Sequence, residues 1–597
     1  MALRFFWFIT LALALVATAG FAAGDSDSDD PASAAEKEMV RDPTTGKMVV
    51  APQYGGTLTR ARNAPCDGTD IWITRCGNIT AGGVVEKLGI ADWATPRDEY
   101  DFHRLQAPAH TIGSLAESWS QPDPLTYIVK VRQGVHWHDK PPMNGRELTA
   151  QDVEYNFQRI LGLGSGFTEP AEIASFDKWS GVKVESITAT DKWTVEFKLK
   201  ERNLRALAAI LNDESGGIYP PEVIKEHGHA NDWRNLVGTG PFMLTDWVEG
   251  SSLTWDKNPD YWGYDEKYPG NSLPYIDQLR ALVMPEPATR LAALRSGRID
   301  YVGFIGTTMI QALDQVESLL KTNPELGIWP AAAASNNSMG MNIQLPPFDD
   351  IRVRKALQMA LNLEEINHAM YGGYADIIPQ GQLSRHIKQA VIQFEDWPED
   401  VKRVFDYDPD GAEALLDEAG YPRGADGIRF ETDLMQLDRY DTDYMELAVS
   451  YWKKIGVNVE IEVEGANFGA RRTSRDYRMM QTDSAAKVSA LGWGGGMRFL
   501  PETHWNTSNT DDPWYNAKFE EKRAATTMDE VNRITKELNQ YAIEQFWSLF
   551  GPVAPTYAVS QPWIIGYNGE GDVGNGQFNP VFARAWIDSE LKEAMGF

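Results

Sequence analysis

The stretch from Leu125 to Leu161 constrains the fold more than any other part of the chain. Its first residues alternate between apolar and other side chains, which is the period of a strand buried mainly on one face. The alternating apolar residues are Leu125, Tyr127, Val129 and Val131. A turn rich in Pro and Gly follows, and apolar residues then recur at helical spacing. Thr149 and Asp152 begin this segment as a helix-capping pair. The stretch therefore predicts a strand, a turn and a helix.

The rest of the chain continues this alternation. Val182–Ile187 and Trp193–Leu199 predict a hairpin, because both alternate and polar residues separate them. A strand is predicted at Arg298–Val302, after a helix. The predicted helices are Pro285–Gly297, Asp349–Leu361, Pro409–Ala419 and Met528–Gln545. Strands and helices mixed in this way predict an α/β protein.

The N-terminus predicts export. Residues 1–23 contain one basic residue, Arg4, then an apolar run and then small residues, which is the pattern of a secretory signal peptide. The apolar run is short for a helix that spans a bilayer, although a retained anchor is the alternative. The only two Cys of the chain, Cys66 and Cys76, lie far beyond the run, so lipid modification is not expected. Residues 24–52 are acidic and small at first and lack apolar periodicity, which predicts a flexible linker.

The chain has two cysteines, Cys66 and Cys76, in a region rich in Gly, Asn, Asp and Thr. In an oxidising compartment this pair predicts a disulfide, which closes a short loop and adds about 2 to 3 kcal/mol of stability. Two unpaired thiols are the alternative. Two Cys without a nearby His do not form a structural zinc site.

Charge and motifs exclude several classes of function. The net charge is -29 and basic residues do not cluster, which argues against a nucleic-acid partner or an anionic membrane surface. The nucleophile elbow G-x-S-x-G, the phosphate loop G-x-x-x-x-G-K-[ST] and the zinc motif H-E-x-x-H are all absent from the sequence. We therefore predict no catalytic residues, no metal site and no cofactor.

Several motifs together resemble family 5 solute-binding proteins, the extracytoplasmic receptors of peptide-type ABC importers. The strand from Leu125 continues into R-Q-G-V-x-W-H-D and then L-T-A-Q-D-V-x-Y-N-F, which is similar to the signature of that family. Further pieces follow in the order of the family. They are Gly238–Phe242, Asn258–Trp262, Arg290–Asp300, Phe348–Leu361 and Asp408–Gly420. The resemblance covers the chain from about Gly55 to its C-terminus.

The resemblance implies a two-lobed periplasmic-binding-protein fold of type II, in its large three-region variety, with mixed β-sheets flanked by helices. Lobe I is then expected from residues 53–90, 221–330 and 547–597. An inserted region packed on lobe I is expected from residues 91–220, and lobe II from residues 331–546. The expected protein is a monomer in the periplasm.

The resemblance also implies the function. Such a receptor captures a small solute, an oligopeptide above all, between two lobes and delivers it to permease subunits in the inner membrane. An oligosaccharide or an opine-like solute is the alternative ligand. A receptor for chemotaxis and a secreted hydrolase are alternative classes, and the hydrolase would need a catalytic dyad that the sequence does not show.

The expected ligand site centres on Trp493, which matches a Gly-Trp segment that lines the cleft in this family. Peptide-binding members carry an acidic residue shortly after this Trp, and it pairs with the amino terminus of the ligand. Gly496 stands at that position here, so peptide binding is in question. Asp438 is a candidate for a substitute carboxylate, and Arg439 or Arg472 for binding a ligand carboxylate. The full expected set is Gly492, Trp493, Gly494, Gly496, Asn337, Met339, Asp438, Arg439 and Arg472.

Overall fold

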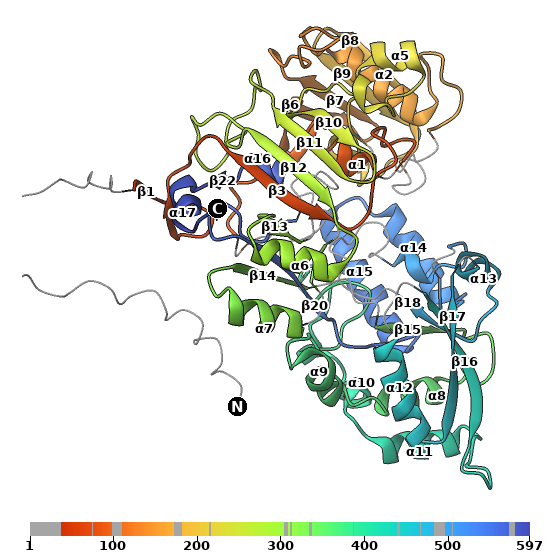
Figure 1. Cartoon of the computed structure of the whole chain (residues 1–597). Helices are drawn as coiled ribbons and strands as arrows, with labels where there is room; N and C mark the ends of the chain where they lie inside the picture. Colours follow the sequence, from red (N-terminus) through yellow and green to blue (C-terminus); the bar gives the residue numbers. More distant parts are fainter. Residues whose placement is uncertain are drawn as a thin grey trace, which may run out of the picture.

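The computed structural model describes most of the chain from residue 37 onward. The described residues are 37–571 and 579–597, without 75, 98, 100–109, 172–181, 214–215, 304–307, 311–312, 333–336, 386, 439–441, 466, 483–495 and 504–505. Three large sheets organise them, and three two-stranded sheets accompany these. A seven-stranded and a four-stranded sheet form the upper part of the molecule in Figure 1, and a five-stranded sheet forms the lower part.

The four-stranded sheet contains the predicted strand–turn–helix unit. Its order is β6 (Ala116–Asp123), β7 (Thr126–Val131), β9 (Thr194–Leu199) and β8 (Val184–Asp191), with antiparallel neighbours. The helix α2 (Ala150–Leu161) covers this sheet, and Thr149 and Asp152 form the expected capping box. Tyr127, Val129 and Val131 are all buried. The structure confirms the unit, although the hairpin turn comes later than predicted because β8 continues to Asp191.

The seven-stranded sheet forms the centre of the upper part. Its order is β10 (Phe242–Val248), β11 (Ser252–Lys257), β12 (Gln278–Val283), β3 (Thr57–Arg62), β13 (Tyr301–Val302), β20 (Pro555–Ser560) and β14 (Gly327–Ala332). Both β12 and β13 run parallel to β3. Side chains of α6 (Pro287–Arg295) and α7 (Leu313–Thr322) form a core with one face of this sheet. The main core lies on the other face, with α1 (Gly77–Thr80) and α16 (Asn579–Ala583) close by.

The five-stranded sheet has the order β17 (Val457–Glu464), β16 (Phe430–Leu437), β18 (Met479–Thr482), β15 (Ser338–Met341) and β19 (Ser548–Leu549). Its core includes side chains of α8 (Ile351–Met359), α9 (Leu363–Tyr371), α11 (Pro409–Glu418) and α12 (Asp443–Lys454). A second core forms around α14 (Pro513–Ala524) and α15 (Met528–Glu544). The predicted helices in this half are confirmed to within a few residues at their ends.

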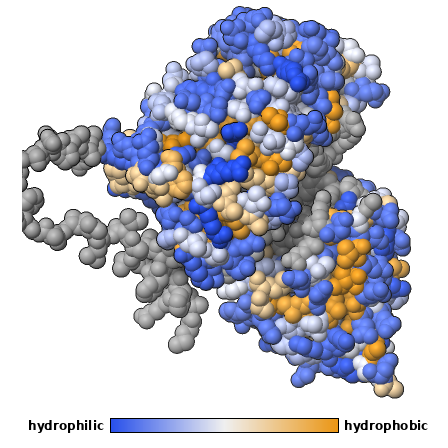
Figure 2. Space-filling model, in the orientation of Figure 1, coloured by the Kyte–Doolittle hydropathy of each residue, from blue (hydrophilic) through white to orange (hydrophobic). Residues whose placement is uncertain are grey.

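Shorter elements complete the fold. The helices are α4 (Ala206–Asn212), α5 (Pro221–His227), α10 (Glu399–Lys402), α13 (Phe468–Ser474) and α17 (Ser589–Ala594). The strands are β1 (Met39–Arg41), β2 (Met48–Val50), β4 (Gly89–Ala91), β5 (Thr111–Gly113), β21 (Ile564–Ile565) and β22 (Trp586–Ile587). Within the described ranges, no helix has both the length and the apolar character needed to cross a bilayer. Figure 2 shows a largely hydrophilic surface on both parts of the molecule.

The chain passes between the two parts twice, once between β14 and β15 and once between β19 and β20. Ser338, at the start of β15, pairs with Thr482 at the carboxyl end of β18, which runs parallel to β16. In the upper sheet, Ala332 pairs with Pro555 at the edge toward which the parallel β12, β3 and β13 run. Both crossing segments therefore join the carboxyl edges of parallel strands, which is where open α/β sheets bind ligands.

One prediction about the N-terminal region is wrong. Residues 37–52 were expected to belong to a flexible linker, but β1 and β2 pair as an antiparallel hairpin. Asp42, in the turn of this hairpin, is buried and accepts a hydrogen bond from Lys267 at 2.9 Å. Lys37 donates to Asp588 at 2.6 Å. These long-range ion pairs order a segment whose local sequence has no apolar periodicity. The signal peptide and residues 24–36 lie outside the described residues.

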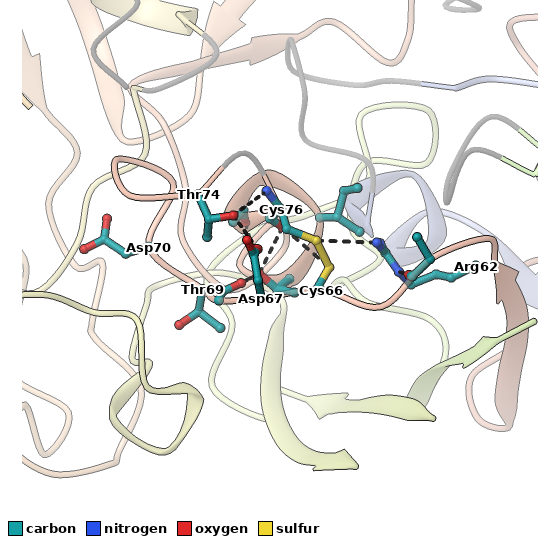
Figure 3. Close-up of a disulfide and its surroundings, with 12 residues drawn as sticks. Arg62, Cys66, Asp67, Thr69, Asp70, Thr74 and Cys76 are labelled. Atoms are coloured by element: carbon teal, nitrogen blue, oxygen red, sulfur yellow. Dashed lines mark hydrogen bonds between the residues drawn. A yellow bond between two sulfur atoms is a disulfide. The ribbon is translucent and has the colours of Figure 1, made fainter. Parts of the chain in front are cut away.

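The structure contains the predicted disulfide. Cys66 and Cys76 are bonded, with their Cα atoms 5.5 Å apart. Figure 3 shows the Arg62 side chain reaching toward the Cys76 sulfur, to which its Nη2 atom donates at 3.4 Å. The Thr74 hydroxyl donates to Asp67 on the other side of the bridge. The disulfide thus fixes the loop that follows β3.

Candidate functional site

Two adjoining cavities lie in the lower part of the molecule, and they share Gln382, Phe499 and Ala542. The first has a volume of about 50 Å³ and the second of about 10 Å³. The remaining residues around the first are Ser338, Gln380, Gly381, Phe405, Arg498, Ile543, Ser548, Leu549 and Phe550. The remaining residues around the second are Gly496, Tyr515, Thr535 and Asn539. The first cavity borders the start of β15, so it lies beside one of the crossing segments.

Gly496 lines the second cavity in a conformation that suits only glycine. Its φ angle is +109°, and it is buried. The Tyr515 hydroxyl donates to the Gly496 carbonyl oxygen at 2.9 Å. A Cβ atom on Gly496 would lie 2.9 Å from that same hydroxyl oxygen. Burial raises the pKa of Tyr515, so the hydroxyl stays protonated and donates. An aspartate at position 496 therefore does not fit this arrangement.

Asn337 and Met339 lie at and just inside the start of β15. Met339 is fully buried and pairs with Gln481 of β18 and Leu549 of β19. The Asn337 side-chain nitrogen donates to the Tyr371 hydroxyl at 2.8 Å and to the Pro552 carbonyl at 2.9 Å. Because Pro552 belongs to the second crossing segment, Asn337 joins the two crossings where they meet the lower part.

Asp438 and Arg472 do not line either of these cavities. Asp438 is exposed at the carboxyl end of β16, and its backbone N–H donates to Glu464 at 2.9 Å. Arg472 belongs to α13, with its guanidinium 5.9 Å from the ring of Phe468. Burial raises the pKa of Tyr477, against the opposing positive charges of Arg475, Arg472 and Arg498.

The other predicted site residues, Gly492, Trp493, Gly494 and Arg439, lie outside the described residues. Their role in ligand binding stays a prediction. Asn337, Met339, Gly496, Asp438 and Arg472 also remain predicted ligand contacts, since their positions alone do not test binding.

Sequence reasoning missed the polar groups of the cavities. Both polar atoms of the Gln382 side chain and the Thr535 hydroxyl are buried and lack a partner in the described part of the chain. Unpaired buried donors and acceptors of this kind suit a small polar group or ordered water. The signal in the sequence is the uncharged run Pro379–Gln382, Pro-Gln-Gly-Gln, which is weak without the tertiary contact.

Comparison with known proteins gives a consistent result. A sequence profile described as "Bacterial extracellular solute-binding proteins, family 5 Middle" matches residues 110–515. Heme-binding protein A of Haemophilus influenzae is 26% identical over 399 residues, which cover 64% of this chain and 66% of that protein. The dipeptide-binding protein of Escherichia coli is 28% identical over 401 residues, which cover 64% of this chain and 68% of that protein. The chain thus spans about two thirds of the length of these relatives.

Solved structures show the same fold. The periplasmic binding protein DppA from Helicobacter pylori, in complex with the peptide STSA, superposes with a TM-score of 0.66 at 20% identity. The match covers 90% of this chain and 99% of that one. At this identity the likeness concerns the fold alone. The comparisons confirm the resemblance inferred from the motifs and the expected α/β fold with mixed sheets.

Proposed function

Because the chain belongs to the bacterial extracellular solute-binding proteins of family 5, we propose that it is the substrate-binding receptor of an ABC importer. It captures a small solute outside the inner membrane and presents it to permease subunits there. It acts as a monomer, without a catalytic step and without a lipid anchor. The family match over residues 110–515 carries this proposal. Its division into lobe I, an inserted region and lobe II, with the bounds given above, is part of the proposal.

The geometry supports a hinge mechanism. The two crossing segments connect the carboxyl edges of the main sheets. The Asn337 side chain donates a hydrogen bond to the Pro552 carbonyl where these segments enter the lower part. A ligand that contacts both parts only when they are closed shifts the equilibrium toward the closed form. The closed form is then the one that the permease recognises.

An oligopeptide is the proposed ligand. The family of the chain and the dipeptide-binding relative support it. The surroundings of Gly496 argue for one difference from the usual peptide site, because a carboxylate does not fit there and a buried ammonium without a partner is costly. The same observation favours a second candidate, a neutral oligosaccharide or an opine-like solute bound by the same receptor.

A thermal-shift screen of the ligand-free protein tests the proposal. The probes are di- to pentapeptides, the same peptides with an acetylated amino terminus, and neutral oligosaccharides. A true ligand at 100 times its Kd stabilises the protein by about 2.7 kcal/mol. Stabilisation by free and acetylated peptides alike is the expected result. Stabilisation by sugars alone would favour the second candidate ligand over an oligopeptide. If no class of probe stabilises the protein, the receptor proposal is contradicted.

Two mass measurements complete the test. The bound compound is expected to leave the protein chemically unchanged, and its conversion would show an enzyme. The exported protein is expected to begin between Gly20 and Asp25 without added lipid, and an intact mass that retains Met1 would contradict export as a periplasmic protein.

A further inference from the structure

Two arginines of β3, Arg60 and Arg62, are buried on the same face of the seven-stranded sheet. Alternation along the strand places them on the face of Leu58, which belongs to the main core. Arg60 has 0% and Arg62 has 3% of its surface exposed. The strand therefore carries two neighbouring cations into the apolar side of the upper part.

Neither guanidinium has all of its donors satisfied. Arg60 donates from Nη2 to the Asn579 side chain at 3.1 Å, and its guanidinium lies 5.7 Å from the ring of Trp255. Among the described residues, its Nε and Nη1 atoms have no acceptor. Arg62 donates from Nε to the Ala64 carbonyl at 3.0 Å and from Nη2 to the Cys76 sulfur. No acceptor for its Nη1 atom lies in the described part of the chain.

Three other buried cations of the described chain have carboxylate partners, and Arg290 and Arg354 donate instead to backbone carbonyls. The three pairs are Lys267 with Asp42, Arg159 with Asp70 and Arg584 with Glu266. No carboxylate among the described residues pairs with Arg60 or Arg62. Burial lowers the pKa of Arg60 to about 9, with the charge of Arg62 as the second cause, and it lowers the pKa of Arg62 to about 10. Both groups therefore stay charged at neutral pH, and a buried charge without a counter-ion costs several kcal/mol.

The two arginines lie toward the edge of the seven-stranded sheet where the crossing segments begin. Arg62 ends β3 at the carboxyl edge of the parallel strands, which is the edge from which the crossing segments leave. Arg60 lies two residues further into the sheet. The disulfide holds the Cys76 sulfur against Arg62 and so fixes the direction of that side chain (Figure 3).

We propose that Arg60 and Arg62 form an anion site that binds a carboxylate of the ligand from the side of the seven-stranded sheet. Their unpaired donors are the hydrogen-bond partners that a carboxylate requires, and a guanidinium binds it in a fixed planar geometry. This proposal rests on the proposed receptor function and deepens it. With the anion site and with glycine at position 496, the receptor recognises the acidic group of its ligand rather than the amino group.

The test measures affinity for matched probes by calorimetry. The probes are trialanine, trialanine amide, and Ala-Glu-Ala amide, which separates a terminal carboxylate from one on a side chain. Wild type is expected to bind at least one carboxylate-bearing probe tenfold or more tightly than trialanine amide. Arg62→Gln and Arg60→Gln are expected to remove this preference, whereas Arg62→Lys keeps part of it.

The stability of the ligand-free variants separates binding from structure. Arg62→Gln is expected to leave the melting temperature unchanged or to raise it, because it removes a buried charge that no carboxylate of the described chain neutralises. Arg290→Gln is the matched control, since Arg290 is also buried but donates to two backbone carbonyls, of Met284 and Pro285. The control is expected to lower the melting temperature and to keep the preference for carboxylate probes. If Arg60→Gln fails to fold, the Arg62 variants decide the question.

The outcomes distinguish this inference from the receptor function. Peptides could bind with the same affinity whether or not they carry a carboxylate, and equally to wild type and to the variants. In that case the anion site is wrong and the receptor proposal stands. If none of the peptides binds, the peptide assignment fails. The melting temperatures of wild type and Arg62→Gln are then compared in succinate and in chloride at equal ionic strength. Stabilisation by succinate that Arg62→Gln abolishes then supports the anion site, and equal effects on both proteins refute it.

Discussion

Replacing Gly496 by alanine tests the reading of the second cavity. The φ angle of +109° costs about 1 to 3 kcal/mol for a residue with a side chain. The new methyl group would also displace the Tyr515 hydroxyl, which lies 2.9 Å from the ideal Cβ position. Loss of the hydrogen bond from this hydroxyl to residue 496 costs about 1 kcal/mol more of unfolding free energy. We expect Gly496→Ala to lower the free energy of unfolding by about 2 to 4 kcal/mol.

The assay is urea unfolding followed by tryptophan fluorescence, with a thermal scan in parallel. Trp547 reports on this region, because its ring centroid lies 5.2 Å from that of Tyr515. At about 2 to 4 °C per kcal/mol for a unit of this size, the melting temperature is expected to fall by about 4 to 16 °C. Gly469→Ala is the control, since Gly469 lies in α13 with open space around its ideal Cβ position. It is expected to be neutral or to stabilise by up to about 1 kcal/mol.

One result would refute the reasoning. If Gly496→Ala unfolds at the same urea concentration as wild type and as the Gly469 control, residue 496 does not need its left-handed conformation. The argument that an aspartate is excluded there would then fail, and the usual peptide site with an acidic residue would be restored as an option.

Further predictions concern stability. Replacing both Cys66 and Cys76 by Ala is expected to cost about 2 to 3 kcal/mol in denaturant unfolding, and no loss would show that the bridge is dispensable. The Lys267 ammonium and neighbouring hydrogen bonds lower the pKa of Asp42 to about 2 against the opposing effect of burial. The ion pair therefore stabilises the fold above about pH 4, and this contribution is lost as the pH falls from about 4 to 2. Asp42→Asn should lower the free energy of unfolding by about 2 kcal/mol at pH 7, and the stability of the variant should change less between about pH 4 and 2. Burial lowers the pKa of Lys522 to about 7, so stability should rise between pH 7 and 10, and Lys522→Met should remove this rise in thermal scans.

Local signals allowed the sequence alone to determine several elements. The capping box of Thr149 and Asp152 and the strand before it depend on residues within a few positions of one another, and the structure has both. The Asp408 cap of α11 is another case, because Asp408 accepts from the N–H of Gly411 as its sequence pattern predicts. The order of such motifs along the chain was also sufficient to indicate the family.

Tertiary structure decided the features that depend on distant residues. The hairpin of β1 and β2 is ordered by the contact of Asp42 with Lys267, 225 positions away, which no local pattern reveals. The cavities beside Gly496 depend on Gln382 and Tyr515, which come from separate segments. In the strand TLTRAR, alternation places Arg60 and Arg62 with Leu58, but only the packed sheet shows that this face is buried and that no carboxylate of the described chain meets them. Burial and charge pairing are set by long-range packing, so the sequence determined the elements and the fold determined the chemistry of the site.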